Sequence, residues 1–200
     1  MKKVSCDENG VKLALRSISN GGVIIFPTDT VYGIGCDPYN KDAVNRIYDL
    51  KKREKTKNLP ILGYSRIDLE KIVEFDEISR IITKEFWPGQ LTLILPLKDK
   101  KLKLSMGLND KIAVRVPDNK CILSLLKGCK LIVGTSANIS STQPFTNPTE
   151  CSNSIKGYDL LLDGGTIQSI GESTIIEIVN NKIKILRQGA ISEEKLSGLI

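Results

Sequence analysis

The sequence alternates short β-branched runs with amphipathic segments, and this alternation constrains the fold more than any other feature. Residues 22–26 and 131–133 have the composition of buried strands. Residues 8–19, with Asp7 as the expected N-cap, and residues 41–52 carry apolar side chains at helical spacing. Strands mixed with helices predict an α/β fold with a mixed sheet.

The remaining elements follow from the same two patterns. Further helices are expected at 67–73, 77–86, 120–126 and 149–156, with a short one starting near Ser192. Further strands are expected at 60–64, 91–95, 112–116, 173–179 and 182–186. Asn180-Asn181 tolerates the positive φ angles of a tight turn, so the last two strands should form a hairpin.

Length and composition indicate one ordinary globular domain over residues 1–200. The chain has 40% apolar and 26% charged residues, and no apolar run reaches the length of a membrane span. Its first residues lack the apolar stretch of a signal peptide. We therefore expect a cytoplasmic protein without membrane contact.

The absence of certain residue types excludes several catalytic mechanisms and metal sites. Histidine is absent, which removes the Ser-His-Asp and Cys-His routes to an activated nucleophile. The cysteines form no C-x-x-C pair, so we expect no zinc site, no disulfide framework, and reduced packing residues at 6, 36, 121, 129 and 151. Catalysis must then use lysine, arginine, carboxylate and hydroxyl groups, with or without a metal ion.

Three polar segments are candidates for a site. The first, Thr28-Asp29-Thr30, follows Pro27, which ends a strand because it has no N–H. Polar side chains just beyond a buried strand stand where open α/β sheets bind ligands. Asp29 is also a candidate metal neighbour, as are Asp163 and Glu172, although surface or turn roles suit the latter two better.

The second segment is strongly basic. The formal net charge is +6, and five of the seven residues from Lys51 to Lys57 are basic. If the helix unwinds after Lys51, that residue and Arg53 share a face and form with Lys57 a cradle for a triphosphate. The alternatives are a solvated surface and cations that complement a helix dipole. A second basic cluster, which like the first favours nucleotide phosphates or RNA, comprises Lys98, Lys100, Lys101 and Lys103.

The third segment, residues 134–140, reads Gly-Thr-Ser-Ala-Asn-Ile-Ser and follows an expected strand. Small residues with hydroxyl and amide groups can approach a phosphate, although a generic turn has the same composition. No Walker motif occurs, and Gly33-Ile34-Gly35 lacks the third glycine of a dinucleotide fingerprint. Taken singly, the three segments leave the ligand open.

Taken together and in order, seven segments make the chain resemble the YrdC/Sua5 family. They are 26–35 (FPTDTVYGIG), the pair Lys51 and Arg53, 87–92 (WPGQLT), 113–117 (AVRVP), 136–140 (SANIS), 172–174 (EST) and 186–189 (LRQG). The resemblance covers nearly the whole chain. It implies a YrdC-like fold, a twisted mixed β-sheet flanked by helices around a basic concave cavity.

The resemblance also implies an activity. Members of the family condense L-threonine, bicarbonate (or carbon dioxide) and ATP to threonylcarbamoyl-AMP and pyrophosphate, for modification of adenosine 37 in tRNA. The expected enzyme is a nucleotidyltransferase that uses Mg²⁺ with ATP and hands its product to a tRNA threonylcarbamoyl transferase complex. The chain looks like the short form of the family, without the C-terminal domain of longer Sua5 proteins.

Roles are carried over residue by residue. Lys51 and Arg53 match the family's catalytic basic pair. The matching residues around ATP are Lys51, Arg53, Lys57, Ser136, Asn138 and Arg187, and those around L-threonine are Thr30, Arg115 and Ser173. Arg115 would bind the substrate carboxylate through two parallel hydrogen bonds. The sequence departs from the family at Leu62 or Gly63, where many relatives have a histidine, and at Glu54, Ser141 and Phe145.

Two other function classes fit parts of the sequence. The basic clusters would suit an RNA-binding or ribosome-maturation protein that contacts tRNA or double-stranded RNA, but 5% aromatic residues offer little for base stacking. A carbamoyl-transferring enzyme of the hydrogenase-maturation type would carry additional zinc-binding and acylphosphatase segments, which the sequence lacks. The synthase is therefore the expected function.

Overall fold

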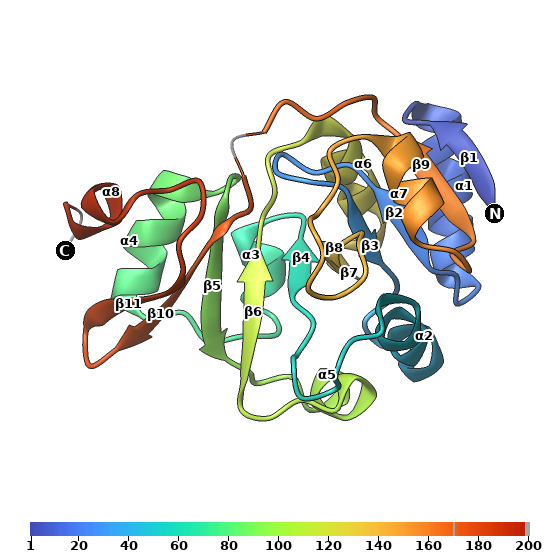
Figure 1. Cartoon of the computed structure of the whole chain (residues 1–200). Coiled ribbons are helices and arrows are strands. Elements are labelled where there is room, and N and C mark those ends of the chain that lie inside the picture. The colour runs from blue at the N-terminus through green and yellow to red at the C-terminus, as the bar shows by residue number, and fades with distance from the viewer. Residues whose placement is uncertain (170, 199–200) are drawn as a thin grey trace.

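The computed structural model describes residues 1–169 and 171–198, and its strands form two mixed β-sheets (Figure 1). The first sheet has the order β1-β9-β2-β3-β8. Its strands are β1 (Lys2–Ser5), β9 (Leu160–Asp163), β2 (Ile24–Phe26), β3 (Gly33–Gly35) and β8 (Thr135–Ser136). β1, β9 and β2 run parallel, whereas β3 pairs antiparallel with both β2 and β8.

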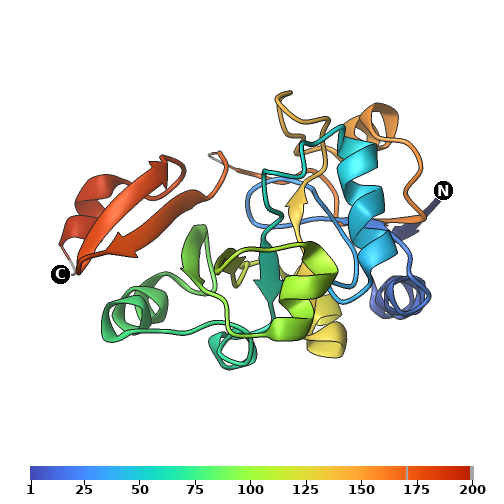
Figure 2. The ribbon, with the colours of Figure 1, turned by 90° about the horizontal axis from the view of Figure 1, so that it is seen from below.

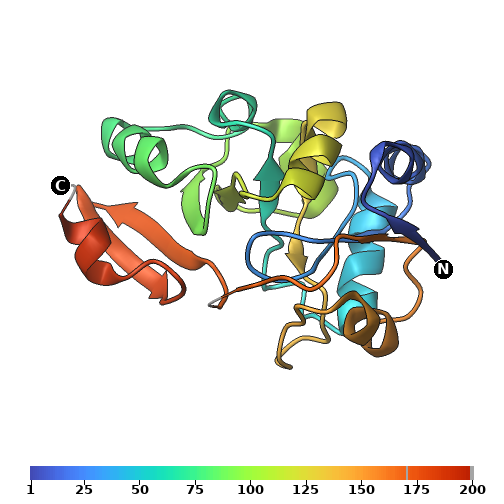
Figure 3. The ribbon, with the colours of Figure 1, turned by 90° about the horizontal axis from the view of Figure 1, so that it is seen from above.

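The second sheet has the order β11-β10-β5-β6-β4-β7. Its strands are β11 (Lys182–Arg187), β10 (Thr174–Val179), β5 (Leu91–Pro96), β6 (Lys111–Arg115), β4 (Ile61–Gly63) and β7 (Leu131–Val133). The pairs β10–β5 and β4–β6 are parallel, and the other three pairs are antiparallel. The hairpin of β10 and β11 lies, with helix α8, at the end of the molecule opposite to β1 (Figures 2 and 3).

Eight helices accompany the sheets in the described part of the chain. They are α1 (Glu8–Ser19), α2 (Lys41–Lys51), α3 (Arg66–Leu69), α4 (Glu77–Phe86), α5 (Lys100–Met106), α6 (Lys120–Cys129), α7 (Pro148–Ser154) and α8 (Glu193–Ser197). Polar caps begin most of them; the Asp7 carboxylate, for example, accepts a 2.8 Å hydrogen bond from the backbone N–H of Gly10. None of the helices within residues 1–169 and 171–198 combines the length and apolar character needed to cross a membrane.

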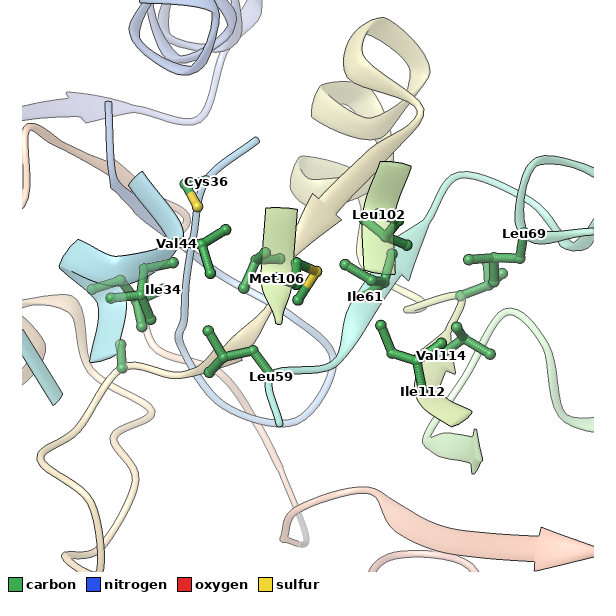
Figure 4. Packing of buried hydrophobic residues seen from close by; sticks show 14 of the residues in the cluster. Ile34, Cys36, Val44, Leu59, Ile61, Leu69, Leu102, Met106, Ile112 and Val114 are labelled. Atoms are coloured by element: carbon green, nitrogen blue, oxygen red, sulfur yellow. The ribbon is translucent and has the colours of Figure 1, made fainter. Parts of the chain in front are cut away.

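One hydrophobic core joins the two sheets (Figure 4). Ile34 enters it from the first sheet, Ile61 and Val114 enter from the second, and Val44 and Met106 come from α2 and α5. All five side chains are buried. A second buried cluster packs α1 and α6 against the first sheet. The two sheets are therefore held together by packing as well as by the chain.

The chain passes from the second sheet to the first at Gly134, between β7 and β8. A side chain at this position would not fit, because an added Cβ would lie 2.4 Å from the Cγ of Leu62. Just before the crossing, the N–H of Val133 donates to the carbonyl of Cys36, which follows β3. The candidate segment 134–140 thus begins where the sheets meet.

Most predicted elements are confirmed. The helices at 8–19 and 77–86 have the expected bounds, and the predicted hairpin turns at Asn180 and Asn181, whose φ angles are 52° and 60°. The predicted single mixed sheet is divided into two, and the predicted helix at 67–73 ends at Leu69. The structure adds five elements that the sequence did not indicate, namely β1, β3, β8, β9 and α5.

The prediction that all five cysteines are reduced is wrong. Cys6 and Cys121 form a disulfide with a Cα–Cα distance of 5.9 Å, whereas Cys36, Cys129 and Cys151 are free. The two bonded residues are 115 positions apart, and they meet because α1 packs against α6. No local spacing pattern reports such a long-range contact.

Candidate functional site

A cavity of about 680 Å³ lies between the two sheets, within the size range of small-molecule sites. The first sheet contributes Gly33, Thr135 and Ser136 to its wall. From the second sheet and its flanks come Leu62, Thr92, Arg115, Ser173, Ile175 and Arg187. Six of the predicted site residues line this cavity, namely Thr30, Arg53, Arg115, Ser136, Ser173 and Arg187.

Arg115 is a buried cation with part of its hydrogen-bonding capacity unused. Its Nε donates to the Gly89 carbonyl at 2.8 Å, Nη1 donates to Thr30 Oγ1 at 3.1 Å, and Nη2 donates to Asp29 Oδ1 at 2.6 Å. Burial lowers the pKa of Arg115, and the Asp29 carboxylate opposes that shift. A guanidinium has five N–H donors, so two have no partner among these contacts, and Arg115 lines the cavity. A carboxylate is the group that suits them.

The loop after β2 is built around Thr28. The Thr28 hydroxyl donates to the Val31 carbonyl at 2.7 Å and accepts from the N–H groups of Thr30 and Val31. Gln90 donates to the Asp29 carbonyl at 2.9 Å, which ties the loop to the start of β5. Thr28 therefore shapes the loop, while the Thr30 hydroxyl contacts Arg115.

A second polar group surrounds Ser173, which immediately precedes β10. The hydroxyls of Ser173 and Thr92 are 2.9 Å apart, and Arg187 Nη2 donates to Ser173 Oγ at 3.1 Å and to its carbonyl at 2.9 Å. Arg187 Nη1 also donates to Glu172 Oε1 at 2.8 Å. Sequence analysis missed Thr92, although a lone polar residue inside the apolar run 91–95 is the signal that could have identified it.

Lys51 lies behind the cavity wall. Its Nζ donates to the carbonyls of Ser136 and, at 2.7 Å, Asn138, and its own carbonyl accepts from the N–H of Ser140 at 2.8 Å. Burial, with help from the Arg53 cation, lowers the pKa of Lys51 to about 7, and Glu172 opposes the shift. These hydrogen bonds from Lys51 hold the backbone of the 136–140 segment in place.

Helix α2 ends at Lys51, which is the condition under which the sequence predicted that Lys51 and Arg53 share a face. Lys52 caps α2 with a left-handed φ of 49°, so Arg53 lies beyond the end of the helix. Arg53 lines the cavity while its Nε and Nη2 donate to the carbonyls of Lys57 and Asn58. The side chain of Lys57 is exposed, lies 3.4 Å from Glu54, and does not reach the cavity wall.

Asn138 is buried and shapes the segment that follows Ser136. Its Nδ2 donates to the Thr142 carbonyl at 2.6 Å and to the Ile139 carbonyl at 3.0 Å. Its Oδ1 and the hydroxyl of Ser140 have no hydrogen-bond partner among the described residues. Asn138, like Lys51, stands behind the wall that Ser136 lines.

The carboxylates give little support for a metal cage in the protein itself. No group of three or more His, Cys, Asp or Glu residues able to hold a metal is found in residues 1–169 and 171–198. Asp29 is paired with Arg115, and Asp163 is paired with Lys3 at 2.9 Å outside the cavity wall. Glu172 lines the cavity, so it alone of the three candidates faces a ligand space.

A family model for Sua5, YciO and YrdC, described as telomere recombination, matches residues 16–189. A threonylcarbamoyl-AMP synthase of Aliivibrio fischeri is 35% identical over 182 residues, which are 86% of this chain and 95% of that protein.

Solved structures agree with the sequence match. Sua5 of Pyrococcus abyssi, solved in complex with L-threonine, is 32% identical with a TM-score of 0.89, and the match covers all of this chain and 59% of that one. This chain therefore spans about three fifths of the Pyrococcus protein. YciO of Escherichia coli matches over 98% of both chains with a TM-score of 0.86 and 22% identity, which shows a shared fold.

Proposed function

This chain belongs to the Sua5/YciO/YrdC family, and we infer from its cavity that it is a threonylcarbamoyl-AMP synthase. The observation that carries this conclusion is the buried Arg115, which lines the cavity beside the Thr30 hydroxyl and uses three of its five N–H donors within the protein. The reaction would join L-threonine, bicarbonate or carbon dioxide, and ATP, and release pyrophosphate. The enzyme class is then nucleotidyltransferase.

The amino acid would be held by the Arg115 side of the cavity. The substrate carboxylate accepts two parallel hydrogen bonds from Arg115, and the hydroxyls of Thr30 and Ser173 supply further polar contacts. Asp29 keeps the guanidinium charged and oriented, because its carboxylate is 2.6 Å from Nη2. This arrangement is fixed before the substrate arrives, which reduces the entropy lost on binding.

ATP would lie against the cations at the other side of the same cavity. Arg53 and Arg187 face the cavity directly, and Ser136 offers a hydroxyl. Lys51 and Asn138 support the segment that carries Ser136. A carbamate oxygen on the threonine nitrogen attacks the α-phosphate, and pyrophosphate leaves. A carbamate is already anionic, so this step needs positioning and charge neutralisation rather than a histidine base.

A Mg²⁺ ion would enter with the triphosphate. Magnesium usually keeps several waters and binds substrate phosphates with one or two protein carboxylates, which matches a cavity that offers Glu172 beside Arg187. When bound, the ion neutralises charge on the leaving pyrophosphate. Arg53 and Arg187 do the same from the protein side.

The product would pass to a tRNA threonylcarbamoyl transferase complex. Exposed lysines on and before α5, which include Lys98 and Lys101, offer a basic surface for a transient contact with tRNA. Binding that is salt-sensitive and indifferent to threonine would instead favour the RNA-binding alternative.

The decisive experiment measures pyrophosphate release from ATP with L-threonine and labelled bicarbonate. We expect release that requires threonine, and we expect Arg53→Ala to abolish it, because Arg53 faces the cavity. Arg46→Ala is the matched control, since Arg46 pairs with Asp159 at 3.0 Å outside the cavity wall. Absence of threonine-dependent release by the unmodified protein would refute the assignment.

A further inference from the structure

Arg115 has two unlike neighbours on the cavity face of the second sheet. On one side, Leu62 of β4 is its direct partner in the parallel β4–β6 ladder. On the other side, the antiparallel β5–β6 pairing ends at Leu93↔Val114, and Thr92 and Arg115 are the next residues of the two strands. Paired residues point to the same face of a sheet, and Leu62, Thr92 and Arg115 all line the cavity. The carboxylate-binding cation thus stands between an apolar side chain and a hydroxyl.

On the Thr92 side of Arg115, one hydroxyl hydrogen is free to bind a ligand. Between Thr92 Oγ1 and Ser173 Oγ, 2.9 Å apart, only one of the two hydroxyl hydrogens can lie in the contact. Ser173 Oγ otherwise accepts from Arg187, and the described residues supply no other acceptor for either hydroxyl. Both side chains are buried, with 4% exposure each. The second hydrogen therefore lacks a partner until a ligand oxygen arrives.

On the other side of Arg115, packing holds the Leu62 side chain in place. Leu62 is 5% exposed, belongs to the buried cluster around α1 and α6, and is packed against Gly134 at the crossing between the sheets. The Leu62 side chain itself has no hydrogen-bonding group to offer a ligand at this position on β4. A ligand atom that rests there must be apolar, because an unpaired polar group would lose its hydration.

We propose that Thr92 and Leu62 together determine which amino acid this chain accepts, by recognising the two substituents of its β-carbon. The proposal rests on the function inferred above and deepens it. With the substrate carboxylate on Arg115, Thr92 hydrogen-bonds a β-hydroxyl on one side, and Leu62 contacts a γ-methyl on the other. A β-carbon with one hydroxyl and one methyl, in one configuration, satisfies both neighbours.

Three close analogues test this arrangement. L-2-Aminobutyrate keeps the methyl but lacks the hydroxyl, L-serine keeps the hydroxyl but lacks the methyl, and L-allo-threonine exchanges the two groups. A buried hydroxyl pair left without its ligand oxygen costs enough to weaken binding about ten- to a hundredfold. A missing methyl weakens hydrophobic contact about tenfold.

The experiment is a calorimetric titration of the whole protein with each amino acid, independent of turnover. Thr92→Val keeps the shape of the side chain and removes its hydroxyl. It should lower the affinity for L-threonine about ten- to a hundredfold and leave that for L-2-aminobutyrate almost unchanged. Thr92→Ser retains the hydroxyl and should restore the preference. Thr83→Val removes a buried hydroxyl of α4 and should change neither affinity.

The outcomes separate the two hypotheses. If Thr92→Val keeps the unmodified protein's ratio of L-threonine to L-2-aminobutyrate affinity, the specificity role is wrong while the synthase activity stands. If L-threonine binds with this dependence on Thr92 but no pyrophosphate is released, the proposed function fails and the specificity role stands. If the unmodified protein binds L-allo-threonine or L-2-aminobutyrate as tightly as L-threonine, the recognition of the β-carbon is refuted directly.

Discussion

Replacing Asp29 by asparagine should destabilise the protein strongly, because it removes the counter-charge of a buried arginine. Asp29 Oδ1 lies 2.6 Å from Arg115 Nη2, and the two side chains are only 10% and 7% exposed. Asparagine keeps the shape and one acceptor but leaves the guanidinium charge uncompensated. Breaking a buried pair in this way costs about 3–5 kcal/mol, and we expect the lower end because the amide oxygen still accepts.

The size of the effect can be measured by heat and by urea. In a protein of this length each kcal/mol lowers the melting temperature by about 2–4 °C, so Asp29→Asn should melt roughly 6–12 °C lower. Asp110→Asn is the matched control, since Asp110 pairs with Lys103 at 2.7 Å but is 91% exposed. Solvent screens that exposed pair, so the change should lower the melting temperature far less than Asp29→Asn does.

Two further measurements distinguish a lost ion pair from a general disturbance. The double change Asp29→Asn with Arg115→Met removes the orphaned charge and should recover part of the lost stability. L-Threonine should raise the melting temperature of Asp29→Asn, because its carboxylate brings a negative charge to Arg115. A fall in melting temperature for Asp29→Asn no larger than that for Asp110→Asn would refute the reasoning.

Three other predictions follow from the geometry. The pKa of Lys51 in the folded protein, about 7, lies below its ordinary value of 10.5. Between these two pH values only the unfolded chain keeps the proton, so the free energy of unfolding rises with pH. Lys51→Met should flatten that rise, measured by urea unfolding at pH 6.5 to 9.5. Serine at both Cys6 and Cys121 should lower the unfolding free energy by up to about 4–5 kcal/mol, given a 115-residue separation, and added reductant should then have no effect. Lys57→Ala should change the KM for ATP less than about threefold, whereas a large rise would bring Lys57 back to the nucleotide side despite its exposed pairing with Glu54.

The sequence predicted the elements that carry their own local signal. The helix at 77–86 has the bounds that the sequence predicted, and the hairpin turns at the predicted Asn180-Asn181. It missed β3, because Gly33-Ile34-Gly35 has neither β-branched alternation nor length, and that strand exists only through pairing with β2 and β8. Tertiary pairing, not propensity, decides such short strands.

The structure brings some of the predicted site residues to the cavity wall and places others behind it. Arg115 and Thr30 meet through a 3.1 Å hydrogen bond although they are 85 positions apart. Lys51 and Asn138 are buried and hydrogen-bonded to backbone carbonyls behind the wall, and their predicted contact with ATP stays a prediction. Sequence patterns indicate which side chains are near a site, but only packing decides which of them face it.

The register of β6 has a consequence for how this site can change through evolution. Arg115 reaches the cavity because Val114 beside it points into the core, and a shift of one residue would exchange the two. An insertion or deletion inside β6 would therefore turn the Arg115 cation into the hydrophobic core and remove it from the cavity wall. Substitutions on the adjacent strands leave the register intact. Lineages that acquire a new amino-acid preference should accordingly differ in side chains on β4 and β5, while the length of β6 stays constant.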